Sequence, residues 1–329
     1  MRKALRKSLS LGALVLLSGV FLLPFLWMLS TSFKHESRIF PPPGQPPQWI
    51  PTTEVRDDLG RPLVTYESKP AVDLGVDDAG RHRLLVDGRE VSAWDEQVEI
   101  RQRIGLHWQN YVRAFEMMDF FQNLRNTLFI CFMTVVGTVL SSSLVAYSFA
   151  RISWHGREAM FLLVLATMML PYQVTLIPLF AVYSNLGWVG SFKPLIVPYF
   201  FGVPFYIFLL RQFFRGIPED LSSAARIDGC TEFGIFARIV LPLSKPALAT
   251  TALFMFLWQW GDFLNPLIYL QDSRQYTLAV ALQQFQSQHE SAWGPLMAMS
   301  TVITLPIIAL FFLTQKTFIQ GITMSGLKG

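Results

Sequence analysis

Six long apolar segments constrain this chain more than any other feature of its sequence. A helix needs about 20 mostly apolar residues to cross the roughly 30 Å hydrocarbon core of a bilayer, and it satisfies its own backbone groups there. The candidates are residues 11–29, 127–149, 160–183, 195–210, 247–270 and 296–313. The sequence therefore predicts an all-α polytopic membrane protein with six transmembrane helices.

Prolines interrupt two of these segments. The third holds Pro171 and Pro178, and the shorter fourth holds Pro198 and Pro204. Proline removes a backbone donor and clashes with the preceding turn. We therefore expect both helices to be kinked or broken.

The composition agrees with burial in lipid. Hydrophobic residues make up 52% of the 329 residues and charged residues only 15%, whereas soluble domains are typically about 25% charged. The apolar content excludes a disordered chain. The two cysteines, Cys131 and Cys230, exclude a disulfide scaffold and leave the redox compartment open.

Basic residues predict the orientation. Thirteen lysines and arginines fall in segments that are cytoplasmic if the N-terminus is inside, against six outside when residues 51–105 are left aside. Cytoplasmic loops carry the excess of positive charge. We therefore expect both termini inside, loops 150–159 and 211–246 in the cytoplasm, and stretches 31–126, 184–194 and 271–295 facing outward.

The first segment also follows four basic residues, as a secretory signal peptide does. Its apolar core is longer than the usual length of about 7–15 residues, and no clear small-x-small cleavage site follows. We expect a retained helix.

A polar block divides the chain into three parts: 1–50, with the first helix and a proline-rich spacer (Pro41 to Pro43, Pro46, Pro47); 51–105; and the membrane core 106–329, with five helices. The block 51–105 holds twelve acidic and eight basic side chains. Turn signals at Asp57-Asp58-Leu59-Gly60, Asp77-Asp78-Ala79-Gly80 and Asp87-Gly88 predict hairpins. Its roughly 55 residues are few for an independent core. We expect a small extracytoplasmic β-rich insertion that either rests on the membrane domain or a partner, or is solvated and has no role of its own.

Motifs that carry chemistry are missing from the sequence. The five histidines lie far apart, and there is no H-E-x-x-H, G-x-S-x-G, C-x-x-C or G-x-x-x-x-G-K-[ST]. We expect no enzyme activity, no cofactor, no metal, no ATP binding and no nucleic-acid partner.

The loop 211–246 carries the most informative local pattern. Pro218 can sit in the first turn of a helix, and the acidic residues after it are favourable beside the N-terminal end of the helix dipole. Gly229 lets the chain turn. The residues expected to share one face are Leu221, Ala224 and Ala225 in this helix, and Phe233, Phe236, Ala237 and Val240 in a second helix that ends at Pro242. Small side chains on such a face allow close approach of a partner.

The loop resembles the E-A-A-x(3)-G-x(9)-I-x-L-P signature of the membrane-spanning subunits of bacterial ABC importers. Matching residues are Ala224, Ala225, Gly229, Ile239, Leu241 and Pro242, while Ser223 stands where the family usually has Glu. The rest of the chain, except about 51–105, is similar to carbohydrate-importer permeases of the maltose-transporter second-subunit type. Supporting matches are Thr31-Ser32-Phe33-Lys34, Asn110-Tyr111, Asn126-Thr127, Ala146-Tyr147-Ser148-Phe149-Ala150-Arg151 and Gly326-Leu327-Lys328-Gly329.

The resemblance implies that the loop is a coupling helix docked on a separate ATPase subunit, which would bind ATP and Mg. The implied coupling residues are Ser223, Ala224, Ala225, Asp228, Gly229, Ile239, Leu241 and Pro242. It further implies half of a permease heterodimer in a bacterial inner membrane, with an ATPase dimer and an extracytoplasmic solute-binding protein. The substrate would be a sugar or oligosaccharide or, alternatively, another small polar solute such as a polyol or glycerol phosphate. The remaining alternative for the loop is an amphipathic hairpin lying passively on the bilayer, with Arg226 and Asp228 merely solvated.

Asp262 is the only acidic residue within the six segments. A carboxylate in a membrane is costly unless it faces water or a partner, so it marks a candidate functional site. Aromatic rings beside amide and carboxylate groups suit a sugar. The candidate pathway residues are Trp258, Trp260, Asp262 and Asn265, with Tyr172 and Gln173 as weaker candidates. The alternative is an interfacial aromatic belt with a structural polar contact.

Two other classes of membrane protein remain as rivals. A secondary transporter needs ion-coupling residues and often shows an inverted repeat, and the sequence shows neither. A membrane-embedded enzyme needs clustered nucleophiles or metal ligands at one depth, and only Asp262 is so placed.

Overall fold

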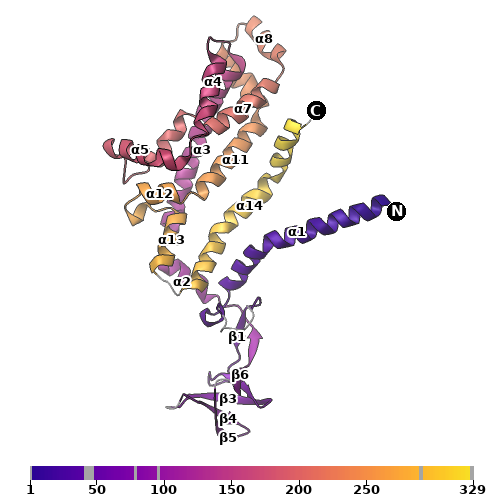
Figure 1. Cartoon of the computed structure of the whole chain (residues 1–329), viewed down its shortest axis with the longest axis vertical. Coiled ribbons are helices and arrows are strands. Elements are labelled where there is room, and N and C mark those ends of the chain that lie inside the picture. The colour runs from indigo at the N-terminus through magenta and orange to yellow at the C-terminus, as the bar shows by residue number, and fades with distance from the viewer. Residues whose placement is uncertain (1, 41–47, 78–79, 95–96, 289–291, 327–329) are drawn as a thin grey trace. The chain divides into compact units, whose positions relative to one another are not determined.

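The computed structural model describes residues 2–40, 48–77, 80–94, 97–288 and 292–326. The chain divides into two compact units, Met1–Met118 with Phe285–Ile303 and Asp119–Gln284 with Thr304–Gly329 (Figure 1). The prolines of the expected spacer lie outside the described residues. So do Asp78 and Ala79 of the second turn signal and residues 327–329 of the terminal match.

The first unit begins with α1 (Arg2–Ser32), which contains the first predicted segment and Pro24. Most of its apolar stretch Ser10–Ser32 is exposed, as suits a helix whose environment is lipid, and only Thr31 and Ser32 at its end are buried within the chain. A short helix η1 (Glu36–Arg38) follows, and α2 (Gln109–Met117) returns to the end of α1. There the amide of Asn110 donates to the carbonyls of Ser32 and Lys34 at 2.9 and 2.8 Å, which satisfies acceptors that a helix end leaves free.

The insertion forms two antiparallel sheets. Its strands are β1 (Thr52–Glu54), β2 (Leu63–Tyr66), β3 (Lys69–Val76), β4 (His82–Val86), β5 (Arg89–Ala93), β6 (Val98–Ile100) and β7 (Gln102–Ile104). β1 pairs with β7, and the other five lie in the order β5-β4-β3-β2-β6. The five-stranded sheet buries a core of its own, made of Val64, Ala71, Leu84, Val86 and Ala93. Whether the insertion also rests on the membrane domain or on a partner stays a prediction.

The turn signals predict the hairpin chemistry correctly. Asp57 accepts the backbone N–H groups of Leu59 and Arg61 at 3.0 and 2.8 Å. The N–H donated by Arg61 is the main reason that the pKa of Asp57 is held below its usual value. Asp87 and Gly88 both have positive φ, 48° and 79°, as a two-residue hairpin loop requires.

The second unit is helical. Its elements are α3 (Phe120–Arg151), α4 (Arg157–Thr167), α5 (Tyr172–Asn185), α6 (Lys193–Ile196), η3 (Val197–Phe201), α7 (Pro204–Gly216), α8 (Glu219–Ile227), α9 (Glu232–Ile235), the π-helical η4 (Phe236–Val240), α10 (Leu241–Leu243), α11 (Lys245–Trp260), α12 (Leu264–Tyr269) and η5 (Ser273–Gln275). Two further helices, α13 (Leu278–Gln288) and α14 (Trp293–Gly326), extend across the boundary between the units.

Four helical stretches among the described residues are long and apolar enough to span a bilayer: Ser10–Ser32, Phe120–Arg151, Lys193–Gly216 and Trp293–Gln315. The number rises to six if two bent pairs each count as one span. Those pairs are Arg157–Thr167 with Tyr172–Asn185, bent by 96°, and Glu232–Leu243 with Lys245–Trp260, bent by 78°. The described residues thus hold four to six candidate spans, where the sequence predicts six.

Three of the predicted segments are not continuous α-helices. The third breaks just before Pro171, and the fourth contains the 3-10 turn η3 and Gly202, as their prolines predict. The fifth was expected to run through residues 247–270. It stops at Trp260 and resumes at Leu264, because the intervening Asp262 accepts hydrogen bonds at the start of α12 and Gly261 lowers helix propensity there.

Helix α3 is the centre of the second unit. It packs along α7 and α11 (Figure 1), and its ends contact other segments of the same unit. Small polar residues such as Thr134, Thr138 and Ser142 are buried along it. Side chains of this size permit close approach of neighbouring helices.

Candidate coupling loop and polar cluster

The helix predicted after Pro218 is present as α8. It begins directly after Pro218, and Glu219 and Asp220 lie in its first turn, where carboxylates interact favourably with the positive end of the helix dipole. It ends at Ile227, and the chain turns at Gly229, whose φ is 79°. The N–H of Gly229 donates to the carbonyl of Arg226 at 3.1 Å, and that of Cys230 to the carbonyl of Ala225 at 2.9 Å. These two bonds form a Schellman motif, so the bend predicted at Gly229 is confirmed.

The two alanines of the motif have different surroundings. Ala225 is 6% exposed and belongs to the apolar core of the second unit, and Ser222 is 1% exposed one turn earlier. Ser223, Ala224 and Ile227 are exposed. Placing Ala224 and Ala225 on one partner-facing face is therefore wrong, because consecutive helical residues point about 100° apart. Ala225 seats the helix, and Ala224 lies on its open side.

The second helix of the loop ends at Leu243, one residue after the predicted Pro242. Helix α9 continues through η4 and α10, and the chain bends near Ser244. Pro242 lies within α10, next to the last residue of this helical stretch, as suits a residue that cannot donate a backbone hydrogen bond. Phe236 and Val240 are buried, whereas Phe233 is 69% exposed. Ile239 and Leu241 are half-buried against the core.

Charged residues tie α8 to its neighbours. Arg226 Nε donates to Glu232 Oε1 at 2.7 Å, and the Tyr147 hydroxyl donates to Glu232 Oε2 at 2.7 Å. The carboxylate raises the pKa of Arg226 above its usual value. Arg226 is therefore paired rather than merely solvated. Asp228, in contrast, is exposed at the end of the helix.

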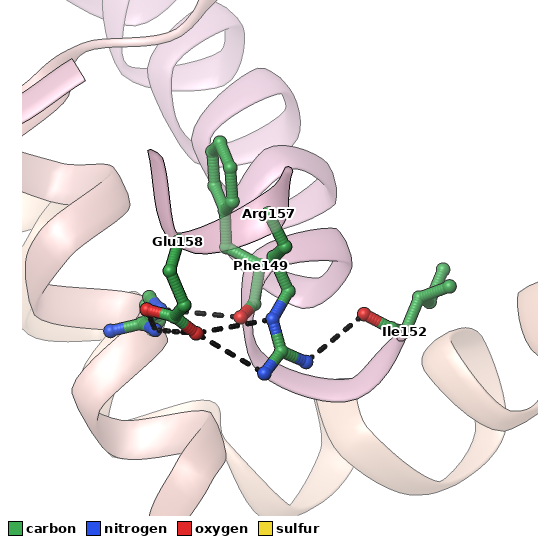
Figure 2. A network of polar contacts seen from close by, with 5 residues as sticks. Phe149, Ile152, Arg157 and Glu158 are labelled. Carbon is green, nitrogen blue, oxygen red and sulfur yellow. Dashed lines mark hydrogen bonds and ion pairs between the residues drawn. The ribbon is translucent and has the colours of Figure 1, made fainter. Parts of the chain in front are cut away.

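A cleft of about 890 Å³ lies beside α8. Its charged lining consists of Arg151, Arg157, Arg215, Arg226, Glu219 and Glu232. Next to it, Glu158 accepts hydrogen bonds from Arg157 and Arg211, and Arg157 donates to the carbonyl of Ile152 (Figure 2). These contacts hold the short connection between α3 and α4 against the start of α4.

Three of the predicted pathway residues come together. Asp262 Oδ2 accepts from Asn265 Nδ2 at 2.9 Å, and the Tyr172 hydroxyl donates to Asn265 Oδ1. This chain of contacts joins α12 to the start of α5. Both helices begin at a break in a predicted segment. The arrangement offers a carboxylate, an amide and a phenol at a point where the backbone is not continuous helix.

The other predicted pathway residues do not take part in the hydrogen bonds of this cluster. Trp260 is 4% exposed, Trp258 is 68% exposed, and Gln173 is exposed. The buried Gln259 Oε1 and Trp260 Nε1 have no hydrogen-bond partner among the described residues. Within those same residues, no group of three or more His, Cys, Asp or Glu side chains is placed to hold a metal ion.

Sequence reasoning missed Tyr147 and Glu232 as functional candidates. Tyr147 lies in the motif Ala146 to Arg151 that supports the family resemblance, and Glu232 follows Thr231, whose hydroxyl accepts from the N–H of Gly234 at 3.2 Å. The Thr-Glu pair is a helix-start signal. Only the fold brings these residues together, since they are 85 positions apart.

Comparison with known proteins identifies relatives of this chain. Residues 137–324 match the family described as "Binding-protein-dependent transport system inner membrane component". The trehalose/maltose transport system permease protein MalG of Thermococcus litoralis is 30% identical over 332 residues, covering 99% of both chains. The arabinooligosaccharides transport system permease protein AraQ of Bacillus subtilis is 38% identical over 210 residues, covering 64% of this chain and 74% of the relative.

A solved structure shares the fold. It is a bacterial ABC transporter involved in the import of the acidic polysaccharide alginate, and one of its chains superposes with a TM-score of 0.67 at 18% identity. The match covers 94% of this chain and 96% of that one.

Proposed function

This chain belongs to the family of binding-protein-dependent transport system inner membrane components, and we propose that it forms half of the pathway by which an ATP-driven importer moves a sugar or oligosaccharide across the membrane. The observation that carries this proposal is the full-length similarity to a trehalose/maltose permease. The saccharides named for this relative and for the arabinooligosaccharide permease favour a sugar over a polyol or glycerol phosphate.

The role of this chain is to transmit movement from the ATPase to the membrane helices. Exposed Ser223, Ala224 and Ile227 of α8 form the surface that meets a separate ATPase subunit, and Ala225 holds the helix on the membrane core. The ATPase subunits bind ATP and Mg, a second permease completes the pathway, and a solute-binding protein delivers the sugar outside. ATP-driven closing of the ATPase dimer then shifts the populations of inward-open and outward-open states.

The substrate residues in this proposal are Tyr172, Asp262 and Asn265. A neutral saccharide offers hydroxyl groups that donate to a carboxylate and accept from an amide. The break between α11 and α12 leaves backbone N–H and C=O groups outside a continuous helix next to these residues. Membrane proteins tolerate such non-helical backbone where the segment lines a cavity or is buried in protein.

Purification of the tagged chain from its native membrane tests the assembly. We expect an ATPase subunit and a second permease to co-purify in stoichiometric amounts, with ATP hydrolysis in the eluate. A chain that purifies without an ATPase, from membranes whose sugar uptake follows an ion gradient, would instead be a secondary transporter.

Thiol labelling tests the orientation, in which both termini are cytoplasmic. The native Cys230 is exposed and Cys131 is buried, so Cys230 reports on α8, and Arg89→Cys reports on the exposed tip of the β4–β5 hairpin. We expect an impermeant reagent to label Cys230 only from the cytoplasm and position 89 only from outside. Labelling of position 89 from the cytoplasm would overturn the proposed topology.

A further inference from the structure

Two side chains on one face of α3 bind the segments on either side of α8. Tyr147 and Arg151 are four residues apart, so they lie above one another on the helix surface. They are 4% and 8% exposed. Neither is used by the proposed pathway, yet both make hydrogen bonds to segments that adjoin α8.

Arg151 fixes the chain just before α8 begins. Its Nη2 donates to the carbonyl of Phe214 at 2.6 Å and to the carbonyl of Ile217. These acceptors lie at the C-terminal end of α7 and immediately after it. A guanidinium is favoured there because helix C-termini carry partial negative charge, and hydrogen bonds from a charged donor are stronger than neutral ones.

Tyr147 fixes the other end of α8 through two ion-paired residues. Its hydroxyl binds Glu232, and Glu232 binds Arg226 in the last turn of α8. The Tyr147 ring also packs on Phe236, with centroids 5.1 Å apart. Between these two attachment points, Ser222 and Ala225 are buried on the inner side of α8.

Side chains at the opposite end of α3 form hydrogen bonds with a different segment. Asn126 Nδ2 donates to the carbonyls of Arg274 and Tyr276 at 2.9 and 3.1 Å. Thr127 Oγ1 accepts the N–H of Leu278 at 2.9 Å. One continuous helix of 32 residues therefore joins the coupling helix to the segment that starts α13.

We propose that Tyr147 and Arg151 are positioning residues that make α8 and α3 move as one body. A displacement of α8 by the ATPase then travels along α3 to the segment 274–278, instead of being absorbed by the loop. This inference rests on the proposed function, because it needs an ATPase that displaces α8. The two attachments act at opposite ends of α8, so the loss of either one lets the helix pivot while still seated.

Tyr147→Phe and Arg151→Gln test this proposal in the purified complex reconstituted into proteoliposomes. Tyr147→Phe keeps the ring packing and removes one hydrogen bond, so it is the variant that preserves folding. Arg215→Gln is the matched control, since Arg215 is an exposed arginine in the last turn of α7. The readout is sugar transported per ATP hydrolysed, which a variant that merely lowers the amount of folded protein leaves unchanged.

We expect this ratio to fall about tenfold or more in each variant while ATP hydrolysis continues, because the loss of even one hydrogen bond to a charged group corresponds to about that factor. Arg215→Gln keeps the wild-type ratio. The labelling rate of Cys230, at the end of α8, should rise in both α3 variants. A wild-type ratio in both would overturn the proposal.

The same experiment separates this inference from the proposed function. If the wild-type complex moves no sugar, the proposed function fails, and the Cys230 labelling rate then decides the positioning role alone. A rate equal to wild type in Tyr147→Phe and Arg151→Gln would show that neither residue holds α8.

Discussion

Ala224 and Ala225 are adjacent in the sequence but lie in different environments. Ala225 contacts the core formed by residues such as Ile235 and Phe236, while Ala224 is exposed on α8. The family motif gives the spacing of these residues. It does not give the side of the helix that faces the chain's own core, because that side depends on how α8 packs on α9 and α3.

This difference makes the pair a matched test. We expect Ala224→Trp to leave the chain folded and membrane-inserted but to prevent its retention of the ATPase, because bulk is added at the proposed contact. We expect Ala225→Trp to lower the free energy of unfolding by about 1–3 kcal/mol, because it overpacks a core. Thermal unfolding in detergent and co-purification of the ATPase measure the two effects. Retention of the ATPase by a folded Ala224→Trp chain would remove this face from the coupling surface.

We expect His107 to make the stability of the first unit depend on pH. Burial is the main reason that the pKa of His107 lies below its usual value, and the nearby His35 and Arg113 act in the same direction. The folded state thus binds a proton less readily than the unfolded state, in which the pKa is about 6.5. Stability is unaffected above about pH 6.5 and is lost as the pH falls toward and below the folded-state pKa.

We therefore expect the Tm of the chain to fall between about pH 7 and pH 5, and to fall less in His107→Gln. His155→Gln, which alters an exposed histidine in the second unit, is the control and should keep the wild-type pH profile. Identical profiles for wild type and His107→Gln would show that this residue does not couple protonation to folding.

Helix breaks are the main feature at the scale of elements. Pro171 predicts the first break because proline cannot continue the preceding helix. The sequence does not predict the break at Gly261 to Phe263, although Asp262 is a residue type typical of a helix start. A long apolar segment hides such local signals, since its periodicity and length both indicate one continuous span.

Asp262→Leu tests what this second break is for. The substitution removes the hydrogen bonds that Asn265 donates to the carboxylate, each of which contributes roughly 1–2 kcal/mol. It also removes any contact between the carboxylate and the sugar. We expect assembly with the ATPase to persist and the apparent affinity for sugar in uptake assays to weaken. Asp262→Asn, which keeps one acceptor oxygen, should retain more of that affinity. An unchanged affinity in Asp262→Leu would mean that the sugar binds elsewhere.

The β-rich insertion is separable as an element. Thr52 and Ile104 are direct partners across β1 and β7, so their Cα atoms lie about 5 Å apart and a short linker can join these strands. The hairpins could be predicted from their Asp and Gly turn residues. The pairing of β2 with β6 could not, because it brings together residues more than 30 positions apart.

Replacing residues 56–100 with a short Gly/Ser linker should leave the membrane helices folded, because they satisfy their own backbone groups. The readouts are the yield of membrane-inserted protein and its helical circular dichroism. Normal protein without uptake would point to docking of the solute-binding protein on the insertion. Loss of stable protein would show that the membrane core needs the insertion.

At the scale of the whole molecule, the chain combines two compact units with different construction. The first carries the β sheets and α1, and the second carries α8 and the polar cluster of Tyr172, Asp262 and Asn265. Composition and apolar segments were enough to predict a helical membrane protein, and the loop motif was enough to predict the family. The hydrogen bonds that hold the segments flanking α8 on α3 were not predictable, because Arg151 contacts residues 63 and 66 positions away.

Sugar uptake by proteoliposomes containing the purified complex, with ATP enclosed or omitted, tests the central claim most directly. Maltose, trehalose and arabinooligosaccharides are the probes, each supplied with the solute-binding protein. We predict that at least one of them accumulates against its gradient only when ATP is hydrolysed, and that uptake is unchanged when ion gradients are collapsed. Accumulation that needs an ion gradient and not ATP would contradict the account.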